Sequence, residues 1–159
     1  MKKIINFPLK KYTKHNLYFD EYIKIKNLLL KQVDQKVLGI IIKEILNAIK
    51  LKRDFFSCGN GGSASTAEHL SCDFSKGSCT NTNLNIKVSS LTSNVSLMTA
   101  IANDISYDDA FSYQLNRFGK ANDVLLVFSV SGKSKNIIKC VQVAKKKKIK
   151  VISFTGFDG

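Results

Sequence analysis

The stretch that decides the fold of this 159-residue chain is residues 54–63, which read DFFSCGNGGS. Its first half is short, apolar and aromatic, as in a buried strand, and its second half is a glycine-rich turn. A helical pattern follows over residues 64–74, so we expect a strand, a tight loop and a helix in direct succession. That succession is the basic unit of an alternating α/β fold.

The same succession repeats toward the C-terminus. We predict further strands over residues 85–90, 124–128 and 151–154, and further helices over residues 95–102, 109–118 and 137–147. Strands that alternate with helices predict a doubly wound, three-layer α/β fold, in which helices cover both faces of a parallel sheet. Right-handed crossovers then place every strand-to-helix loop at the carboxyl edge of the sheet, where ligands bind in such folds.

Two helical patterns precede the first strand, over residues 19–32 and 34–50. Residues 1–16 carry mixed charge and Pro8, and we expect them to be irregular. We therefore divide the chain into an N-terminal lead and helix, residues 1–34, and an α/β domain, residues 35–159.

The composition is globular and strongly basic, with 25 Lys and Arg against 12 Asp and Glu, a formal charge of +13. Much of the excess is Lys in the N-terminal third and in the run 145–148, which is typical of solvated surface. Arg makes the commonest specific contact to bases, and the chain has only Arg53 and Arg117. Nucleic-acid binding driven by charge is therefore the weakest of three functional interpretations; the other two depend on the motifs described below.

Four cysteines, at positions 58, 72, 79 and 140, form no CxxC pair and follow no secretory signal, so we expect free thiols in a reducing cytosol. Cys58 falls in the first predicted strand, where Cys behaves as a small hydrophobe. No apolar stretch is long enough to cross a membrane. We expect a cytoplasmic protein with no membrane partner.

Two loops have residues that suit a phosphate group. In residues 58–63 the glycines permit a sharp turn and close approach to a ligand, and Ser63 can cap the next helix or donate to a phosphate oxygen. In residues 129–134 three hydroxyls and one glycine lie between an apolar strand and a helix. Each loop alone also fits a plain turn with a serine N-cap. Together, at one sheet edge, they favour a single compact phosphate.

Neither loop matches a nucleotide motif. The GxxxxGK[ST] spacing of a nucleoside-triphosphate loop is missing from residues 129–134, and the adjacent glycines of residues 58–63 do not fit GxGxxG. We expect no nucleotide cofactor.

His69 and Asp73 stand four residues apart on the helix that follows the first loop, so both project from one face. That spacing can hold a metal or pair an acid with a base. The alternative is an ordinary histidine beside a carboxylate.

Four ordered motifs resemble the SIS (sugar isomerase) family, and most closely its phosphoheptose isomerase branch. They are residues 56–64 (FSCGNGGSA), 97–104 (LMTAIAND), 123–136 (DVLLVFSVSGKSKN) and 150–156 (KVISFTG). The resemblance covers roughly residues 35–159. It implies an aldose–ketose isomerisation of sedoheptulose 7-phosphate to D-glycero-D-manno-heptose 7-phosphate for lipopolysaccharide or other glycans. It also implies a homotetramer with active sites at subunit interfaces and, in several members, a bound zinc.

The resemblance assigns roles by position. The phosphate would be held by the four serines of the loops, and the sugar would be lined by polar residues from the first loop and the 97–104 motif. Asp73 would be the catalytic base, and His69 a metal ligand or polar catalytic group, with both as candidate zinc ligands. The substrate-binding set is Asn60, Gly61, Gly62, Ser63, Asn103, Asp104, Ser129, Val130, Ser131 and Ser134.

Three departures from the family pattern bear on activity. Asp73 stands where the branch usually has Glu, which is one methylene longer, and Val130 replaces a common hydroxyl residue. The family normally continues through another strand and a long helix that carries a Gln and a second His, whereas this sequence stops at Gly159. We therefore expect either a fragment of an isomerase or, as the alternative, a non-catalytic phosphosugar-binding or regulatory protein.

Overall fold

The computed structural model describes residues 7, 8 and 10–157 of the chain. Two compact units are present, Met1–Ile42 and Lys43–Gly159, and each is described by itself. The division between them falls inside a helix, between Ile42 and Lys43. The boundary that we predict between residues 34 and 35 stays a prediction.

Two helices precede the sheet, as the apolar spacing predicts. Helix α1 spans His15–Leu30 and helix α2 spans Gln35–Lys50. Asp34 starts α2 by accepting a hydrogen bond from the amide of Lys36 at 2.8 Å, which is the role of an N-cap. Helix α1 begins earlier than the predicted residue 19, so the irregular lead ends before His15; residues 1–6 and 9 of that lead lie outside the described residues.

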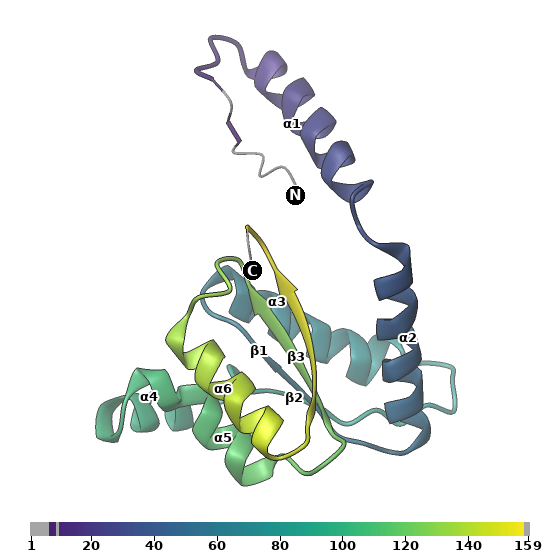
Figure 1. Ribbon diagram of the computed structural model, residues 1–159, viewed down its shortest axis with the longest axis vertical. Helices are drawn as coiled ribbons and strands as arrows, with labels where there is room; N and C mark the ends of the chain where they lie inside the picture. The colour runs from purple at the N-terminus through teal and green to yellow at the C-terminus, as the bar shows by residue number, and fades with distance from the viewer. Residues whose placement is uncertain (1–6, 9, 158–159) are drawn as a thin grey trace. The chain divides into compact units, whose positions relative to one another are not determined.

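The sheet is parallel and four-stranded, with the order β2-β1-β3-β4 (Figure 1). Its strands are β1 (Phe55–Cys58), β2 (Val88–Ser90), β3 (Val124–Ser129) and β4 (Lys150–Thr155). Strand β1 pairs with β3 in the register Phe55↔Val124, and β3 pairs with β4 over six residues. All four predicted strands are confirmed, and β2 is shorter than its predicted range of residues 85–90.

Helices cover both faces of the sheet, which confirms the doubly wound, three-layer α/β class. Helix α3 (Gly62–Cys72) packs on β1, β2 and β3. Helix α6 (Lys135–Lys146) packs on β3 and β4 from the other face, where it also contacts α5 (Ala110–Phe118) (Figure 1). Helix α4 (Val95–Asp104) packs against α5, and two short turns, η1 (Asp73–Gly77) and η2 (Tyr107–Asp109), complete the fold.

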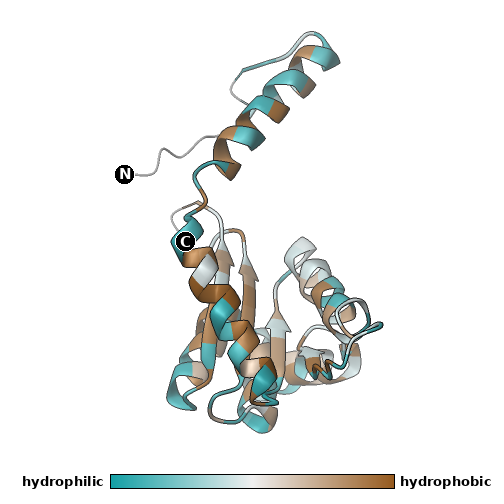
Figure 2. Cartoon of the chain, turned by 90° about the vertical axis from the view of Figure 1, so that its right-hand side faces the viewer, coloured by the Kyte–Doolittle hydropathy of each residue, from teal (hydrophilic) through white to brown (hydrophobic). Residues whose placement is uncertain are grey.

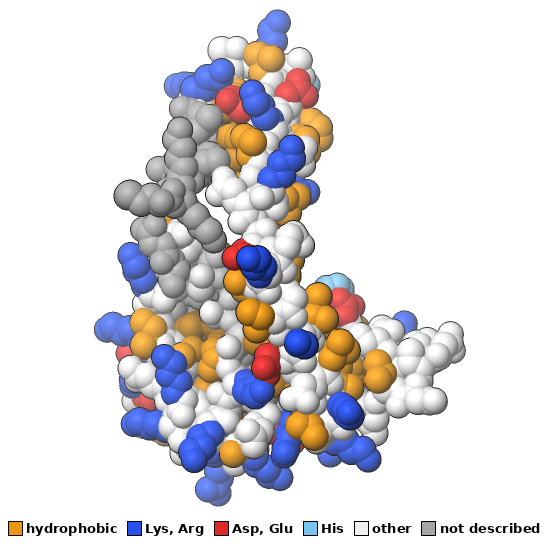
Figure 3. Space-filling view, turned by 45° about the vertical axis from the view of Figure 1, so that its right-hand side comes forward, with side chains coloured by type: hydrophobic (Ala, Val, Ile, Leu, Met, Phe, Trp, Pro, Cys, Tyr) orange, Lys and Arg blue, Asp and Glu red, His pale blue; other side chains and the backbone are white. Residues whose placement is uncertain are grey.

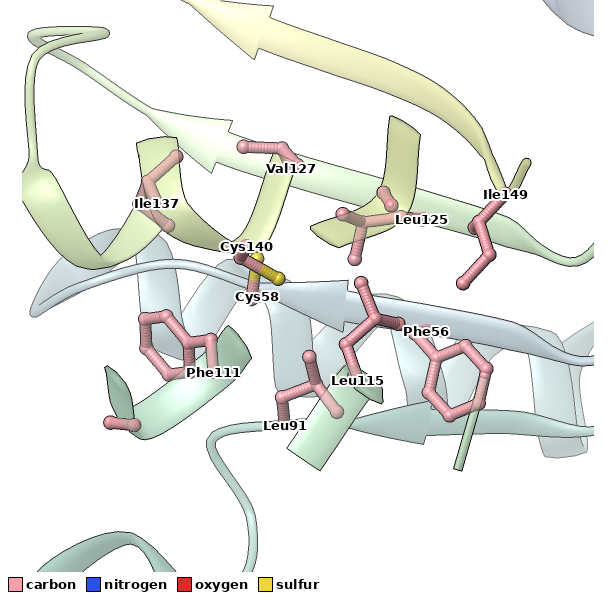
Figure 4. Packing of buried hydrophobic residues seen from close by; sticks show 12 residues of the cluster. Phe56, Cys58, Leu91, Phe111, Leu115, Leu125, Val127, Ile137, Cys140 and Ile149 are labelled. Atoms are coloured by element: carbon pink, nitrogen blue, oxygen red, sulfur yellow. The ribbon is translucent and has the colours of Figure 1, made fainter. Parts of the chain in front are cut away.

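The core lies between the sheet and helices α5 and α6. Phe56, Leu125 and Val127 from the strands meet Phe111 and Leu115 from α5, and all five are buried (Figure 4). Strand β3 is apolar along its length because it is central and buried on both faces. This rigid centre fixes the ends of β1 and β3, and those ends position the candidate site.

Helix α2 keeps an apolar stripe at its surface, visible as brown patches in Figure 2. Val37, Ile40, Ile42 and Leu46 are each about half exposed or more. None of the helices in the described part of the chain is long and apolar enough to span a membrane.

Candidate active site

The candidate site lies where the connections of the sheet change direction. After β1 the chain returns through α3 to β2 on one side, and after β3 it returns through α6 to β4 on the other. The loops that follow β1 and β3 therefore diverge from neighbouring strands. Such a switch point is the usual ligand site of a doubly wound sheet.

The first loop is held in a conformation that only glycine can adopt comfortably. A Cβ on Gly59 would lie 2.4 Å from the carbonyl oxygen of Ser63, and Gly61 has a φ of +54°. Gly61 is also the N-cap of α3, so of the two roles considered for Ser63, helix cap or phosphate donor, the first belongs to Gly61. Ser63 lies inside the first turn, and among the described residues its hydroxyl has no hydrogen-bond partner. It is free to donate to a ligand together with the amides at the helix start.

The second loop uses its serines to shape itself. The hydroxyl oxygen of Ser129 accepts from the amide of Gly132 at 3.1 Å, and that of Ser131 accepts from the amide of Lys133 at 3.2 Å. Gly132 permits the turn with a φ of +64°. A serine hydroxyl that accepts a bond still has its O–H to donate, so both side chains keep a donor for a phosphate oxygen.

The two ends of the second loop differ. Ser134 is the N-cap residue of α6 but makes no side-chain capping bond, which leaves its hydroxyl available. Val130 points to solvent with 64% of its surface exposed, while its carbonyl accepts from the amide of Gly156 at 3.1 Å. Val130 contributes backbone geometry to the loop and no side-chain donor.

A side-chain bridge joins the two loops. Asn60 and Asn136 exchange two amide hydrogen bonds, each 2.9 Å long, and Asn136 is almost fully buried. Asn136 also accepts from the amide of Ile137 at the start of α6, and the Tyr107 hydroxyl donates to Asn60 at 2.9 Å. The sequence analysis missed Asn136 and Tyr107 as site residues. The position of Asn136 in the first turn after the second loop is the signal that could have found it.

His69 and Asp73 lie on the continuation of the first loop. His69 is in the last turn of α3, and Asp73 begins the π-helical turn η1. The His69 Nε2 and Asp73 Oδ2 atoms are 3.6 Å apart, which confirms that they share a face. Both side chains are exposed, 79% for His69 and 62% for Asp73. Such a pair can move a proton, but the described residues of this chain do not shield it from water.

The donor set at this pair does not complete a zinc site. Zinc in proteins takes three or four protein ligands. His69 and Asp73 supply two, and the described residues contain no group of three or more His, Cys, Asp or Glu side chains placed to hold a metal. A zinc ion at this position needs further ligands.

Asn103 and Asp104 end helix α4, and both are exposed. The Asn103 amide donates to the Asp104 carboxylate at 2.9 Å. Within the described residues no hydrogen bond ties either side chain to the two loops. The connection of this region to the site is Tyr107, which follows three residues later and contacts Asn60.

A second carboxylate on α3 also faces polar groups at the sheet edge. Glu68 accepts from the Thr92 hydroxyl at 3.3 Å, and Thr92 and Ser90 share a short hydroxyl contact of 2.6 Å after β2. Glu68 is a site residue that was not predicted from the sequence. It is the natural comparison for Asp73 because it lies five residues earlier, on α3, which continues directly into η1.

A buried thiol pair lies beneath the first loop. Cys58 ends β1 and lies beside Cys140 of α6, and both are fully buried (Figure 4). The hydrogen bond with Cys140 and burial together raise the pKa of the Cys58 thiol well above its ordinary value. The Cys58 thiol therefore stays protonated, and its burial confirms the prediction that Cys58 is a small core residue.

A doubly wound sheet with a glycine-rich loop and a serine-rich loop at its switch point is the architecture of α/β proteins that bind small phosphorylated ligands at the carboxyl edge. The chain belongs to the SIS domain family, whose model matches residues 18–156.

Two relatives of this chain in the family are both named phosphoheptose isomerase. The phosphoheptose isomerase of Helicobacter pylori is 34% identical over 146 residues, which cover 91% of this chain and 76% of the relative. The phosphoheptose isomerase of Colwellia psychrerythraea is 43% identical over 103 residues, or 65% of this chain and 52% of the relative. The match to the Colwellia protein therefore spans about half of that protein's length.

Solved structures agree with the sequence relatives. The structure of phosphoheptose isomerase GmhA from Neisseria gonorrhoeae has a TM-score of 0.80 at 33% identity and covers 91% of this chain and 74% of that protein. A phosphoheptose isomerase from Francisella tularensis has a TM-score of 0.82 at 27% identity, with coverage of 91% and 75%. The predicted fold class and the family resemblance are both confirmed.

Proposed function

We propose that this chain is a phosphosugar isomerase that interconverts sedoheptulose 7-phosphate and D-glycero-D-manno-heptose 7-phosphate. The observation that carries the proposal is the joined pair of loops at the ends of β1 and β3, directly followed by the His69–Asp73 helix. Relatives named phosphoheptose isomerase support the same substrate. They also favour catalysis over the alternative of a non-catalytic binding protein.

The loops would hold the phosphate. Ser63, Ser131 and Ser134 are partly or fully exposed hydroxyls, and Ser129 keeps a donor beneath them. The amides at the starts of α3 and α6 add the positive ends of two helix dipoles. Asn60 and Gly61, together with Gly62, would line the sugar next to the phosphate.

Asp73 would act as the base in the isomerisation. Its carboxylate removes a proton from C1, the terminal carbon next to the ketone, and the electron pair moves toward the carbonyl oxygen, which takes up a proton to give an enediol. The base then returns its proton to C2, the former carbonyl carbon, while the C1 hydroxyl gives up its proton, so that C1 becomes the aldehyde and the carbonyl oxygen remains as the C2 hydroxyl. His69 lies 3.6 Å from Asp73 and would stabilise its carboxylate. It would also polarise the C1 and C2 oxygens of the sugar, which lose and gain a proton in the reaction.

We also propose that the active form is a homo-oligomer, with a tetramer as the specific expectation. The exposure of His69 and Asp73 supports this, because a proton-transfer site works best when water is excluded. Exposed apolar residues on α2 supply a surface that a second copy could cover. The compartment we propose is the cytoplasm, which suits the free thiols, and the pathway is heptose supply for lipopolysaccharide.

The test is an isomerase assay with sedoheptulose 7-phosphate, in which the aldose product is trapped and quantified. Wild-type turnover that disappears in Ser131→Ala at limiting substrate and recovers at high substrate supports a phosphate clamp. Saturable binding of the sugar phosphate by calorimetry with no turnover would overturn the enzyme assignment and favour the binding protein.

A further inference from the structure

A basic pocket lies at the amino edge of the sheet, away from the two phosphate loops. It has a volume of about 530 Å³ and is formed by the end of α2 and the segment that enters β2. A hydrogen bond of 2.8 Å from the amide of Phe55, the first residue of β1, to the carbonyl of Lys87 ties the segment that enters β2 to the start of β1. The lining residues are Ile49, Lys50, Lys52, Arg53, Asn83, Leu84, Asn85 and Lys87.

The charge of this pocket is of one sign. Four of its lining residues are cationic and none is acidic. Within the described part of the chain, Lys50, Lys52, Arg53 and Lys87 make no ion pair, although Lys139 and Lys150 elsewhere do. Lys and Arg side chains gather over the lower part of the view in Figure 3, where the strands begin.

Arg53 provides a second observation. Its Nε atom is buried and has no hydrogen-bond partner among the described residues. A buried N–H without a partner is rare in folded proteins. Arg53 also lines the pocket, where its guanidinium group suits a phosphate oxygen, and a bound anion that draws the side chain toward it would leave Nε less enclosed.

The backbone that carries these cations is also unusual. Helix α2 ends in a turn in which Lys52 has a φ of +53°, and the amide of Arg53 bonds back to Ala48 at 2.9 Å. Glycine is the usual residue in this left-handed position, where a side chain costs about 1 kcal/mol. The partial negative charge at the end of α2 accounts for one nearby lysine. It does not account for Lys87, which comes from a different segment.

The size and charge of the pocket define the ligand class. A volume of about 530 Å³ is that of a small-molecule site. Four cations exceed the charge of one phosphate group, and the amides of Asn83 and Asn85 offer further polar contacts. We propose that this basic pocket binds a small anion with two or more linked phosphates, either free or carried by a nucleoside. It is a second site, separate from the phosphosugar loops.

Calorimetry with tripolyphosphate tests the proposal on the full chain. We expect one bound anion per chain, and affinity about tenfold weaker or more for orthophosphate and for Lys87→Gln. The matched control is Lys146→Gln, which removes one exposed lysine from α6 outside the pocket. Equal losses in Lys87→Gln and Lys146→Gln would overturn the proposal, because diffuse surface charge would then explain the binding.

A second variant separates binding from folding. Lys52→Gly relieves the left-handed strain, so it should raise the free energy of unfolding while it weakens tripolyphosphate binding about tenfold. Unchanged binding in this variant would count against the site. The Ser131→Ala variant should bind tripolyphosphate normally, and loss of binding there would place the anion in the phosphosugar loops instead.

The source of the phosphates is distinguished by two further ligands. Tighter binding of ATP than of tripolyphosphate would identify a nucleoside-linked ligand, and equal binding would identify a free polyphosphate; both support the proposal. Stronger binding of a short DNA duplex that displaces tripolyphosphate would overturn it in favour of a nucleic-acid surface.

Discussion

The two loops and the His69–Asp73 pair belong to one candidate site, but the chain holds them very differently. The loops are fixed by buried contacts, including the double amide bridge between Asn60 and Asn136. The pair stands on the surface, with both side chains more than half exposed. The phosphate-binding loops are thus fixed by contacts within one chain, whereas the His69–Asp73 pair is exposed to solvent. Changes in the loops should alter stability and binding together, and changes in the pair should alter turnover alone.

The largest expected effect is on turnover in Asp73→Asn. Loss of the base should lower the isomerisation rate by about 10²- to 10⁴-fold. Stability should stay within about 0.5 kcal/mol, because the carboxylate is exposed. The rate is measured by product trapping, and binding of the sugar phosphate by calorimetry. The matched variant is Glu68→Gln, on α3 just before η1. If Asp73→Asn keeps wild-type turnover while Glu68→Gln loses it, Glu68 is the base.

The next largest effect should come from Gly59→Ala, which changes the rigid first loop. Its Cβ would lie 2.4 Å from a backbone oxygen, so the loop must shift. We expect a loss of about 1–3 kcal/mol in the free energy of unfolding, measured in urea, with weaker sugar-phosphate binding. Gly62→Ala is the stability control, since a Cβ there has no neighbour within 4 Å. Equal stability of the two variants would show that the first loop is less constrained than its geometry indicates.

Asn136→Ala should have an effect of the same kind and of comparable size. It removes the amide bridge and leaves buried groups without partners, at a cost of about 1–3 kcal/mol, and should loosen both loops. Tyr107→Phe removes a single bond to Asn60 and should cost about 0.5–1.5 kcal/mol. If Asn136→Ala keeps wild-type affinity for the sugar phosphate, the bridge serves the fold and not the site.

The smallest effect concerns the pH dependence of stability beneath the first loop. The pKa of Cys58 is raised in the folded chain by its bond with Cys140 and by burial, so the folded state holds this proton more tightly than the unfolded state. The stabilising contribution is therefore complete below the unfolded thiol pKa of about 8.5 and is lost as the pH rises above it. Urea unfolding at pH 7.5 and 9.5 should show a smaller decline in Cys58→Ala than in the wild type.

The fold could be predicted well because the spacing of apolar residues and the burial of a strand are visible within short segments of sequence. The apolar run of β3 and the glycine turn after β1 identify themselves by composition, and the helix over residues 34–50 starts at its capping Asp34 as expected. The prediction was wrong where tertiary contacts decide, because residues 85–87 precede β2 without joining it. The two roles considered for Ser63 could not be separated by sequence, and the capping role belongs to Gly61.

The site was predictable only in part, for the same reason. The serines and glycines lie in motifs that one segment displays, so their loops could be found. The bridge between Asn60 and Asn136 joins residues 76 positions apart, and no local pattern reveals such a partner. The exposure of His69 and Asp73 depends on what packs around α3, which spacing along one helix does not determine.

The order of the strands has a consequence for how the chain acquires its binding capacity. Strand β1 pairs with β3, yet β2, α4 and α5 lie between them in the sequence. Closing so long a segment is slow compared with forming helices. The two loops therefore come together only when β1 and β3 pair. During refolding, helical circular dichroism should recover before sugar-phosphate binding does, and a nascent chain that has not yet reached β3 has its first loop but no site.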